Sequence, residues 1–195
     1  MTGTLYITGD ERADALLNSD ANALLIGMLL DQQVPMEWAF AGPATLLDRL
    51  GHLDPARIAA MDVDDLVAVC CEKPAIHRFP ASMGARLHQL CATLVEDHAG
   101  EASNIWSEVT DAATVKRRLS NLPGYGDEKS KIFVALLAKT QGLTLDGWER
   151  AAGAFGDDQP RSVADAHDAA SLACVREWKK AQKAAKRDKQ DRPLA

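Results

Sequence analysis

A short glycine-containing turn carries the clearest chemical signal in this sequence. Its five residues are Leu122, Pro123, Gly124, Tyr125 and Gly126. Glycine lets a backbone turn tightly and come close to a ligand without a Cβ in the way. A helix-forming run, residues 127–139, begins directly afterwards, and the unpaired N–H groups at a helix start bind phosphate. We therefore predict a phosphate contact at the turn, with Lys129 and Lys131 as further phosphate contacts or as ordinary solvated charges.

Asp146 is the second residue that could do chemistry. Asp146 and Glu149 have the spacing of a capping box, in which the aspartate caps a helix. A carboxylate at a helix start is also favoured in its charged form by the helix dipole. A charged carboxylate can stabilise positive charge that develops in a transition state. The two roles are compatible, and the sequence alone leaves both open.

The elements that must position these residues are predicted to be helices. Apolar residues recur three and four apart through most of the chain. Carboxylates that can cap a helix start stand at Asp10, Asp20, Asp54, Asp62 and Asp111. The run 82–98 ends before Gly100, which is typical of a left-handed helix end. Only residues 5–8 look like a strand, and they are too short to build a sheet, so we predict an all-α fold.

Composition indicates a globular protein with an uneven charge distribution. The net charge of −6 argues at first against nucleic acid as a partner. Residues 1–115, however, hold six Lys and Arg against 17 Asp and Glu, whereas residues 116–195 hold 16 against 11. The basic part begins just before the glycine turn. A local positive surface is enough for a phosphate contact.

The four cysteines form no ligand or disulfide pattern, and no apolar segment precedes them. We therefore expect a reduced cytoplasmic protein without a structural metal, and no membrane span. Basic residues three or four apart near the end predict a basic face on the last helix, either solvated or extending a DNA contact: Arg176, Lys179, Lys180, Lys183 and Arg187.

Four segments resemble the HhH-GPD superfamily of base excision DNA glycosylases, and most closely its endonuclease III-like members. They are LLIGMLLDQQV at residues 24–34, the helix-forming segment 85–100, LPGYGDEKSK at the turn, and LTLDGWER around Asp146. The segments occur in the order of the family. The resemblance implies a helix-hairpin-helix element that grips DNA, although a similar glycine turn can also be a plain helix connector.

The resemblance also implies the architecture. It predicts an all-α, two-lobed helical bundle with a cleft between the lobes and the hairpin and aspartate at its mouth. One lobe would comprise residues 21–135, and the second residues 1–20 together with 136–195. The N-terminal segment would return to pack beside the C-terminal helices.

The resemblance implies roles for particular residues. Asp146 matches the catalytic carboxylate. Gly147 and Trp148 follow it here, where the family usually has threonine or a similar small residue and then histidine or another polar residue. Gln33, and less surely Gln32, matches the turn that inserts a side chain into the base stack; the alternative is a pair of solvated loop glutamines. Gln32, Trp38 and Trp148 are candidate base-pocket residues, and core packing is the alternative role of the two tryptophans.

The same comparison argues against strand cleavage and against a cofactor. Members that cut the strand carry a lysine two residues after the second hairpin glycine, where this chain has Glu128. A carboxylate cannot form the Schiff base that a lysine forms. Only Cys174 follows Asp146, and one cysteine cannot hold an iron–sulfur cluster.

The predicted function is therefore that of a monofunctional DNA N-glycosylase of base excision repair. Its expected partner is double-stranded DNA with a damaged base, and we expect a monomer. A non-catalytic helix-hairpin-helix protein that binds DNA structure is the alternative. It would use Asp146 only as a helix cap.

Overall fold

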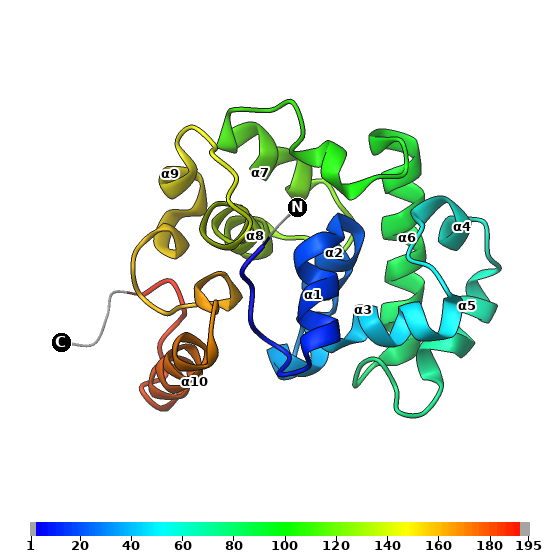
Figure 1. Cartoon of the computed structure of the whole chain (residues 1–195), viewed down its shortest axis with the longest axis horizontal. Helices are drawn as coiled ribbons and strands as arrows, with labels where there is room; N and C mark the ends of the chain where they lie inside the picture. The colour runs from blue at the N-terminus through cyan, green and yellow to red at the C-terminus, as the bar shows by residue number, and fades with distance from the viewer. Residues whose placement is uncertain (1–2, 192–195) are drawn as a thin grey trace.

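The computed structural model describes residues 3–191, and within them the chain forms ten α-helices and no β-strand (Figure 1). The all-α prediction is confirmed. The first six helices are α1 (Glu11–Ser19), α2 (Ala21–Leu30), α3 (Met36–Leu50), α4 (Pro55–Ala59), α5 (Val63–Cys71) and α6 (Pro80–His98). They are followed by α7 (Ala112–Ser120), α8 (Asp127–Thr140), α9 (Trp148–Ala152) and α10 (Ala169–Ala184). Three short 3-10 helices are η1 (Ala102–Ile105), η2 (Gly153–Gly156) and η3 (Val163–Asp165).

Aspartate caps begin the helices where the sequence predicts them. The carboxylates of the five predicted caps accept backbone N–H bonds at the starts of α1, α2, α4, α5 and α7. Each such bond satisfies a donor that the helix itself leaves free. The end of α6 differs slightly from the prediction, because Ala99 already has a φ of +52° before Gly100, at +77°.

Helix α2 lies at the centre of the molecule, between α1, α3 and α8 in Figure 1. Nine of its ten residues are buried, from Asn22 to Leu30. A helix that is apolar on all sides is buried on all sides, and the sequence of α2 accordingly shows no polar face. The two ends of this central helix lead to two different surfaces of the protein.

The described residues before α1 run extended along the C-terminal part of the chain. Thr4 N–H donates to the Thr140 carbonyl at 2.8 Å, and Tyr6 N–H donates to the Ala166 carbonyl at 3.0 Å. These bonds connect the segment to the end of α8 and to η3, but form no sheet. The segment thus returns to the C-terminal part of the chain, as the family resemblance implies.

Helices α7 and α8 are joined by the predicted hairpin and rest on an aromatic cluster. The ring of Phe133 in α8 lies 5.6 Å from that of Trp106 and 6.2 Å from that of Tyr125, with Tyr125 edge-on. Such pairs add to the stabilisation from buried area. The hairpin is therefore joined to the core through the same residues that pack α8.

Candidate functional site

The apolar residues of the hairpin hold it to the core. Leu122 and Tyr125 are buried, and the Tyr125 hydroxyl donates a 2.6 Å hydrogen bond to the Leu25 carbonyl in α2. Burial raises the pKa of this hydroxyl well above its usual value, so it remains protonated and able to donate. These two side chains therefore anchor the turn, while Gly124 and Gly126 are exposed.

The two hairpin glycines serve different purposes. Gly124 has a φ of +81°, and a Cβ there would lie 2.5 Å from Cδ1 of Leu29. Gly126 has an ordinary φ of −104° and open space where a Cβ would lie. It is the N-cap of α8, whose first turn receives no side-chain cap. Gly124 is thus required by the fold, whereas Gly126 leaves the start of α8 open to an anion.

Two lysines flank the start of α8 and share one carboxylate. The amines of Lys116 and Lys131 each lie 2.7 Å from an oxygen of Asp127. Their hydrogen bonds hold the pKa of Asp127 below its usual value. Because the Asp127 side chain is 63% exposed, these ion pairs contribute little stability. Lys131 can therefore exchange its surface partner for a phosphate at small cost.

Lys129 is turned inward. Its amine donates 2.7 Å hydrogen bonds to the carbonyls of Met28 and Leu29, at the end of α2. It also lies 5.8 Å from the centre of the Tyr125 ring. Burial lowers the pKa of Lys129 to about 8. The structure thus directs this amine to the protein backbone and away from the phosphate that the sequence suggests for it.

Asp146 combines a fixed backbone with a free side chain. Its N–H donates to the Thr110 carbonyl at 2.6 Å, and its carbonyl accepts a 3.1 Å bond from Ala112 N–H. The predicted capping box is wrong, because α9 begins at Trp148 and its N-cap is Gly147, with a φ of +71° and no side-chain bond. Within the described chain, the exposed Asp146 carboxylate accepts no hydrogen bond. The carboxylate is therefore available for chemistry.

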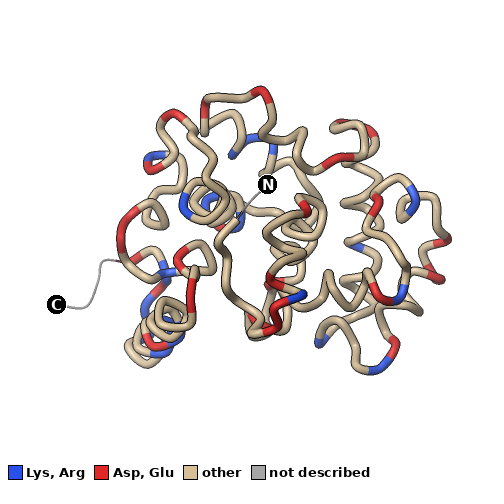
Figure 2. Tube along the Cα trace, viewed as in Figure 1, with Lys and Arg blue, Asp and Glu red and all other residues tan. Residues whose placement is uncertain are grey.

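A hollow of about 700 Å³ opens beside Asp146. Its charged lining residues are Asp111, Lys116, Arg117, Lys131, Asp146 and Arg150. Its other lining residues are small, and none of them is aromatic. Figure 2 shows that Lys and Arg are also frequent on α7, α8 and α10. The hollow can receive an anionic sugar–phosphate chain beside the carboxylate.

Gln32 is tied into the protein. Arg86 Nη1 donates a 2.8 Å bond to its side-chain oxygen, and its own amide donates a 3.3 Å bond to the Leu29 carbonyl. His77 is buried, and its Nε2 lies 2.8 Å from the Gln32 carbonyl. Because His77 Nδ1 accepts the backbone N–H of residue 79, the proton is on Nε2, which donates to that carbonyl. Gln32 therefore supports the turn.

Gln33 is presented to solvent. It is exposed and has a φ of +56°. No hydrogen bond to its side chain occurs within residues 3–191. Of the two glutamines, Gln33 is thus the one free to enter a base stack.

The two candidate tryptophans lie in different places. Trp38 is 41% exposed, donates from its indole to the Ala75 carbonyl at 3.2 Å, and lies 6.4 Å from the His77 ring. Trp148 is half-buried against the core and lines a separate hollow of about 580 Å³ with Lys139. Neither tryptophan lines the hollow beside Asp146. Their base-pocket role stays a prediction.

Sequence reasoning missed Phe79 and Arg86. Phe79 is 45% exposed at the start of α6, and both residues line a small hollow of about 230 Å³ together with Gln33. An exposed aromatic residue beside a polar turn can contact unstacked bases. The only sequence signal was an aromatic residue before a helix-starting proline, which core aromatics share.

The C-terminal segment, residues 186–191, lies against the start of α8. Lys189 donates to Glu128 at 2.9 Å, and Lys131 donates to the Gln190 side chain at 3.2 Å. Arg161, only 3% exposed, donates to the Lys189 carbonyl at 2.8 Å. Glu128, at the lyase-lysine position, is therefore engaged in an ion pair with Lys189 and stays partly exposed.

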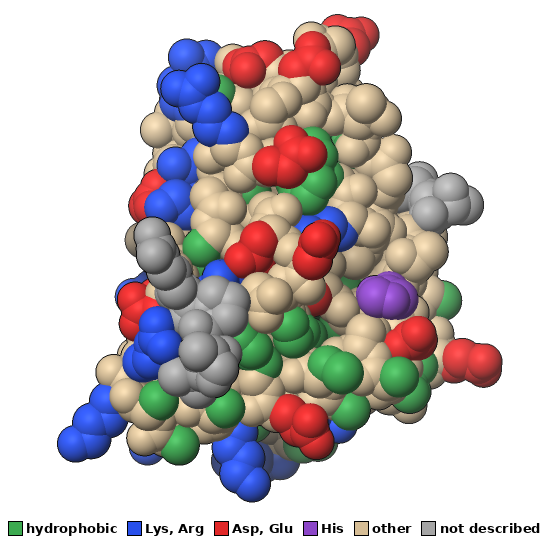
Figure 3. All heavy atoms as spheres, turned by 90° about the vertical axis from the view of Figure 1, so that its left-hand side faces the viewer, with side chains coloured by type: hydrophobic (Ala, Val, Ile, Leu, Met, Phe, Trp, Pro, Cys, Tyr) green, Lys and Arg blue, Asp and Glu red, His purple; other side chains and the backbone are tan. Residues whose placement is uncertain are grey.

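The predicted basic face of α10 is only partly free. Arg176 pairs with Glu37 at 2.5 Å, and the Lys179 amine contacts the Met36 sulfur at 3.2 Å. Burial lowers the pKa of Lys179. On the face in Figure 3, hydrophobic side chains gather in the lower half, and Lys and Arg follow the left edge. The inner residues of the face thus serve the contact between α10 and α3.

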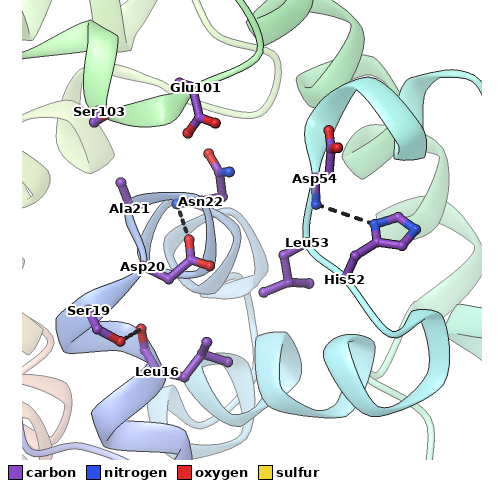
Figure 4. A pocket seen from close by; sticks show the side chains of 10 residues that line it. All are labelled: Leu16, Ser19, Asp20, Ala21, Asn22, His52, Leu53, Asp54, Glu101 and Ser103. Carbon is purple, nitrogen blue, oxygen red and sulfur yellow. Dashed lines mark hydrogen bonds between the residues drawn. The ribbon is translucent and has the colours of Figure 1, made fainter.

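The opposite end of α2 opens into an acidic hollow of about 730 Å³ (Figure 4). Asp20, Asp54 and Glu101 contribute carboxylates from three segments. His52 lies among them, and burial lowers its pKa, which favours its neutral form. This hollow repels a polyanion, so it is no DNA contact.

No three His, Cys, Asp or Glu side chains of residues 3–191 are grouped as metal ligands. Cys70 and Cys91 are buried, and burial raises the pKa of each thiol to about 12. Cys174 is exposed on α10. The lack of an iron–sulfur cluster stays a prediction from the cysteine positions. None of the described helices is long and apolar enough to cross a membrane.

The fold and the site define an all-α protein with a helix-hairpin-helix element, an open helix start and an exposed carboxylate nearby. Residues 26–192 match the family model of the HhH-GPD superfamily base excision DNA repair proteins, and the chain belongs to this family. The family resemblance seen in the sequence is confirmed, and with it a base excision repair function on DNA. No curated protein matches the chain.

Proposed function

We propose that this protein is a monofunctional DNA N-glycosylase that hydrolyses the bond between a damaged or mispaired base and its sugar. The observation that carries the proposal is the state of Asp146. Its backbone is held by two hydrogen bonds, its side chain is exposed and unbonded within the described residues, and cations line the hollow beside it.

A carboxylate in this position suits the chemistry of base release. As the glycosidic bond breaks, the base leaves with the bonding electrons and C1′ becomes oxocarbenium-like. A fixed carboxylate stabilises that positive charge and accepts a proton from the attacking water. The water oxygen then bonds to C1′, and the departing base takes up a proton. The products are the free base and an abasic sugar.

The hairpin and the glutamine turn supply the two other requirements. The open start of α8 would bind a backbone phosphate, with Lys131 leaving Asp127 to assist. The target base must leave the stack to react. Gln33, which is exposed at its turn, would fill the gap that the base leaves.

Glu128 supports hydrolysis without strand cleavage. A lyase needs an amine that attacks C1′, and the corresponding position here holds a carboxylate paired with Lys189. The nearest amine in sequence, Lys129, is engaged by two carbonyls. Borohydride should therefore trap no covalent adduct between this protein and damaged DNA.

The test is a panel of duplexes, each with one damaged or mispaired base, scored for free base and for abasic DNA. We expect release from at least one duplex, and a loss of about 10²- to 10⁴-fold in the Asp146→Asn variant with DNA affinity and fold kept. Undiminished release by Asp146→Asn would exclude the assigned role. Tight DNA binding without release from any duplex would instead favour the non-catalytic binder.

A further inference from the structure

The turn that carries Gln33 is gripped from two sides. From the α6 side, His77 and Arg86 hold the backbone and side chain of Gln32. From the α8 side, Lys129 binds the carbonyls of Met28 and Leu29, which directly precede the turn. Four hydrogen bonds from distant parts of the sequence thus converge on a few residues.

The turn needs this support because its tip is strained. Gln33 has a φ of +56°, a conformation that costs a residue with a Cβ free energy. Such conformations persist only where the surroundings over-determine them. The exposed side chain of Gln33 makes no hydrogen bond in the described chain, so the support must come from the neighbours that hold residues 28–32.

Lys129 is an unusual support. Burying its amine costs free energy, as its lowered pKa shows, and the carbonyls that it binds end a helix, where a positive charge is favourable. It sits three residues after Gly126, on the helix whose start would bind phosphate. Its two bonds therefore connect the phosphate-binding element directly to the glutamine turn.

We infer that Lys129 is a positioning residue that holds the Gln33 turn at a fixed place relative to the hairpin. It acts through Gln33 and touches neither the phosphate nor the reacting atoms. The inference rests on the proposed function, because it assumes that Gln33 enters the base stack while the hairpin binds the DNA strand. Lys129 would keep these two elements at a fixed distance from each other.

A double-mutant cycle tests this coupling. The variants are Lys129→Met, which keeps the apolar stem but removes the amine, Gln33→Ala, and both together. Lys139→Met is the control on the same helix. The Lys139 amine is also held inside the protein, where it donates to the Asp157 carbonyl at 2.6 Å and pairs with Asp165 at 2.7 Å. Both contacts lie far along α8 from the turn. Lys129→Arg keeps the charge and the donors, and it serves as the second variant if Lys129→Met does not fold.

Base release in a single turnover is the first measurement. We expect Lys129→Met and Gln33→Ala each to slow base release about tenfold. The double variant should be no slower than either single variant, because both substitutions remove the same function. Lys129→Arg should restore most of the rate. In the double variant of Lys139→Met and Gln33→Ala, the two effects on the rate of base release should instead multiply. Full multiplication of Lys129→Met with Gln33→Ala would overturn the inference.

Amide hydrogen exchange of residues 31–34 in the free protein is the second measurement, and it needs no DNA. Lys129→Met should speed exchange there about tenfold, whereas Lys139→Met should leave it unchanged. If the wild type releases no base, the proposed function fails, and exchange alone decides the positioning inference. Unchanged exchange in Lys129→Met would overturn it.

Discussion

Replacing each hairpin glycine with alanine should separate stability from DNA binding. In Gly124→Ala, the residue would keep a φ of +81°, which costs a residue with a Cβ about 1–2 kcal/mol. Its Cβ would also lie 2.5 Å from the buried Leu29 side chain, and such overpacking costs about 1–3 kcal/mol. We therefore expect a loss of about 2–5 kcal/mol in the free energy of unfolding.

Gly126→Ala is the control at the neighbouring glycine. Its φ of −104° is ordinary, and a Cβ there meets open space. Alanine is a poorer N-cap than glycine, so we expect a cost below about 1 kcal/mol. The new methyl group would, however, stand where a phosphate approaches the start of α8, and DNA affinity should fall by about tenfold, or about 1.4 kcal/mol.

Urea unfolding followed by circular dichroism measures the first effect, and fluorescence anisotropy with a labelled duplex measures the second. For a chain of this size, the loss in Gly124→Ala corresponds to a Tm lower by roughly 4–20 °C. Equal losses of stability in the two variants would refute the distinction drawn from the backbone angles. So would unchanged DNA affinity in Gly126→Ala.

Two further predictions follow from burial. A thiol reagent should modify the exposed Cys174 rapidly in the folded protein. Cys70 and Cys91 should react only after unfolding, because they are buried and burial raises the pKa of each thiol to about 12. Rapid modification of Cys70 and Cys91 under native conditions would contradict this packing. Folding lowers the pKa of Lys129 from 10.5 to about 8. Between these pH values the unfolded chain binds more protons than the folded protein, so the free energy of unfolding should rise with pH. Relative to Lys129→Met, the wild type should gain on the order of 2 kcal/mol from about pH 8 to about pH 10. Parallel stability curves for the two proteins over this range would show that the amine is not buried.

Local patterns in the sequence predicted the helices because their start signals are local. A carboxylate at Asp111, for example, needs only the N–H groups of the next few residues to form its cap. The apolar run in α2 likewise depends on its own composition. Fold class and most helix starts could therefore be derived without any tertiary information.

Long-range contacts account for what the sequence could not show. Asp146 does not cap α9 as predicted, because its backbone pairs with residues 110 and 112, which lie more than thirty positions earlier. Lys129 turns inward because carbonyls about one hundred positions away accept its amine. Charge and spacing give a lysine its neighbours along a helix, but only the packing of α8 on α2 decides which way it points.

Helix α2 also orders the charges of the molecule along one axis. At its N-terminus, Asp20 and the carboxylates of Figure 4 surround the positive end of the helix dipole; at its C-terminus, Lys129 meets the negative end. The two ends are about 15 Å apart, the length of ten helical residues. The carboxylates at the N-terminal end of α2 repel a polyanion that approaches this net-negative protein, which favours approach from the end of α2 where the hairpin lies.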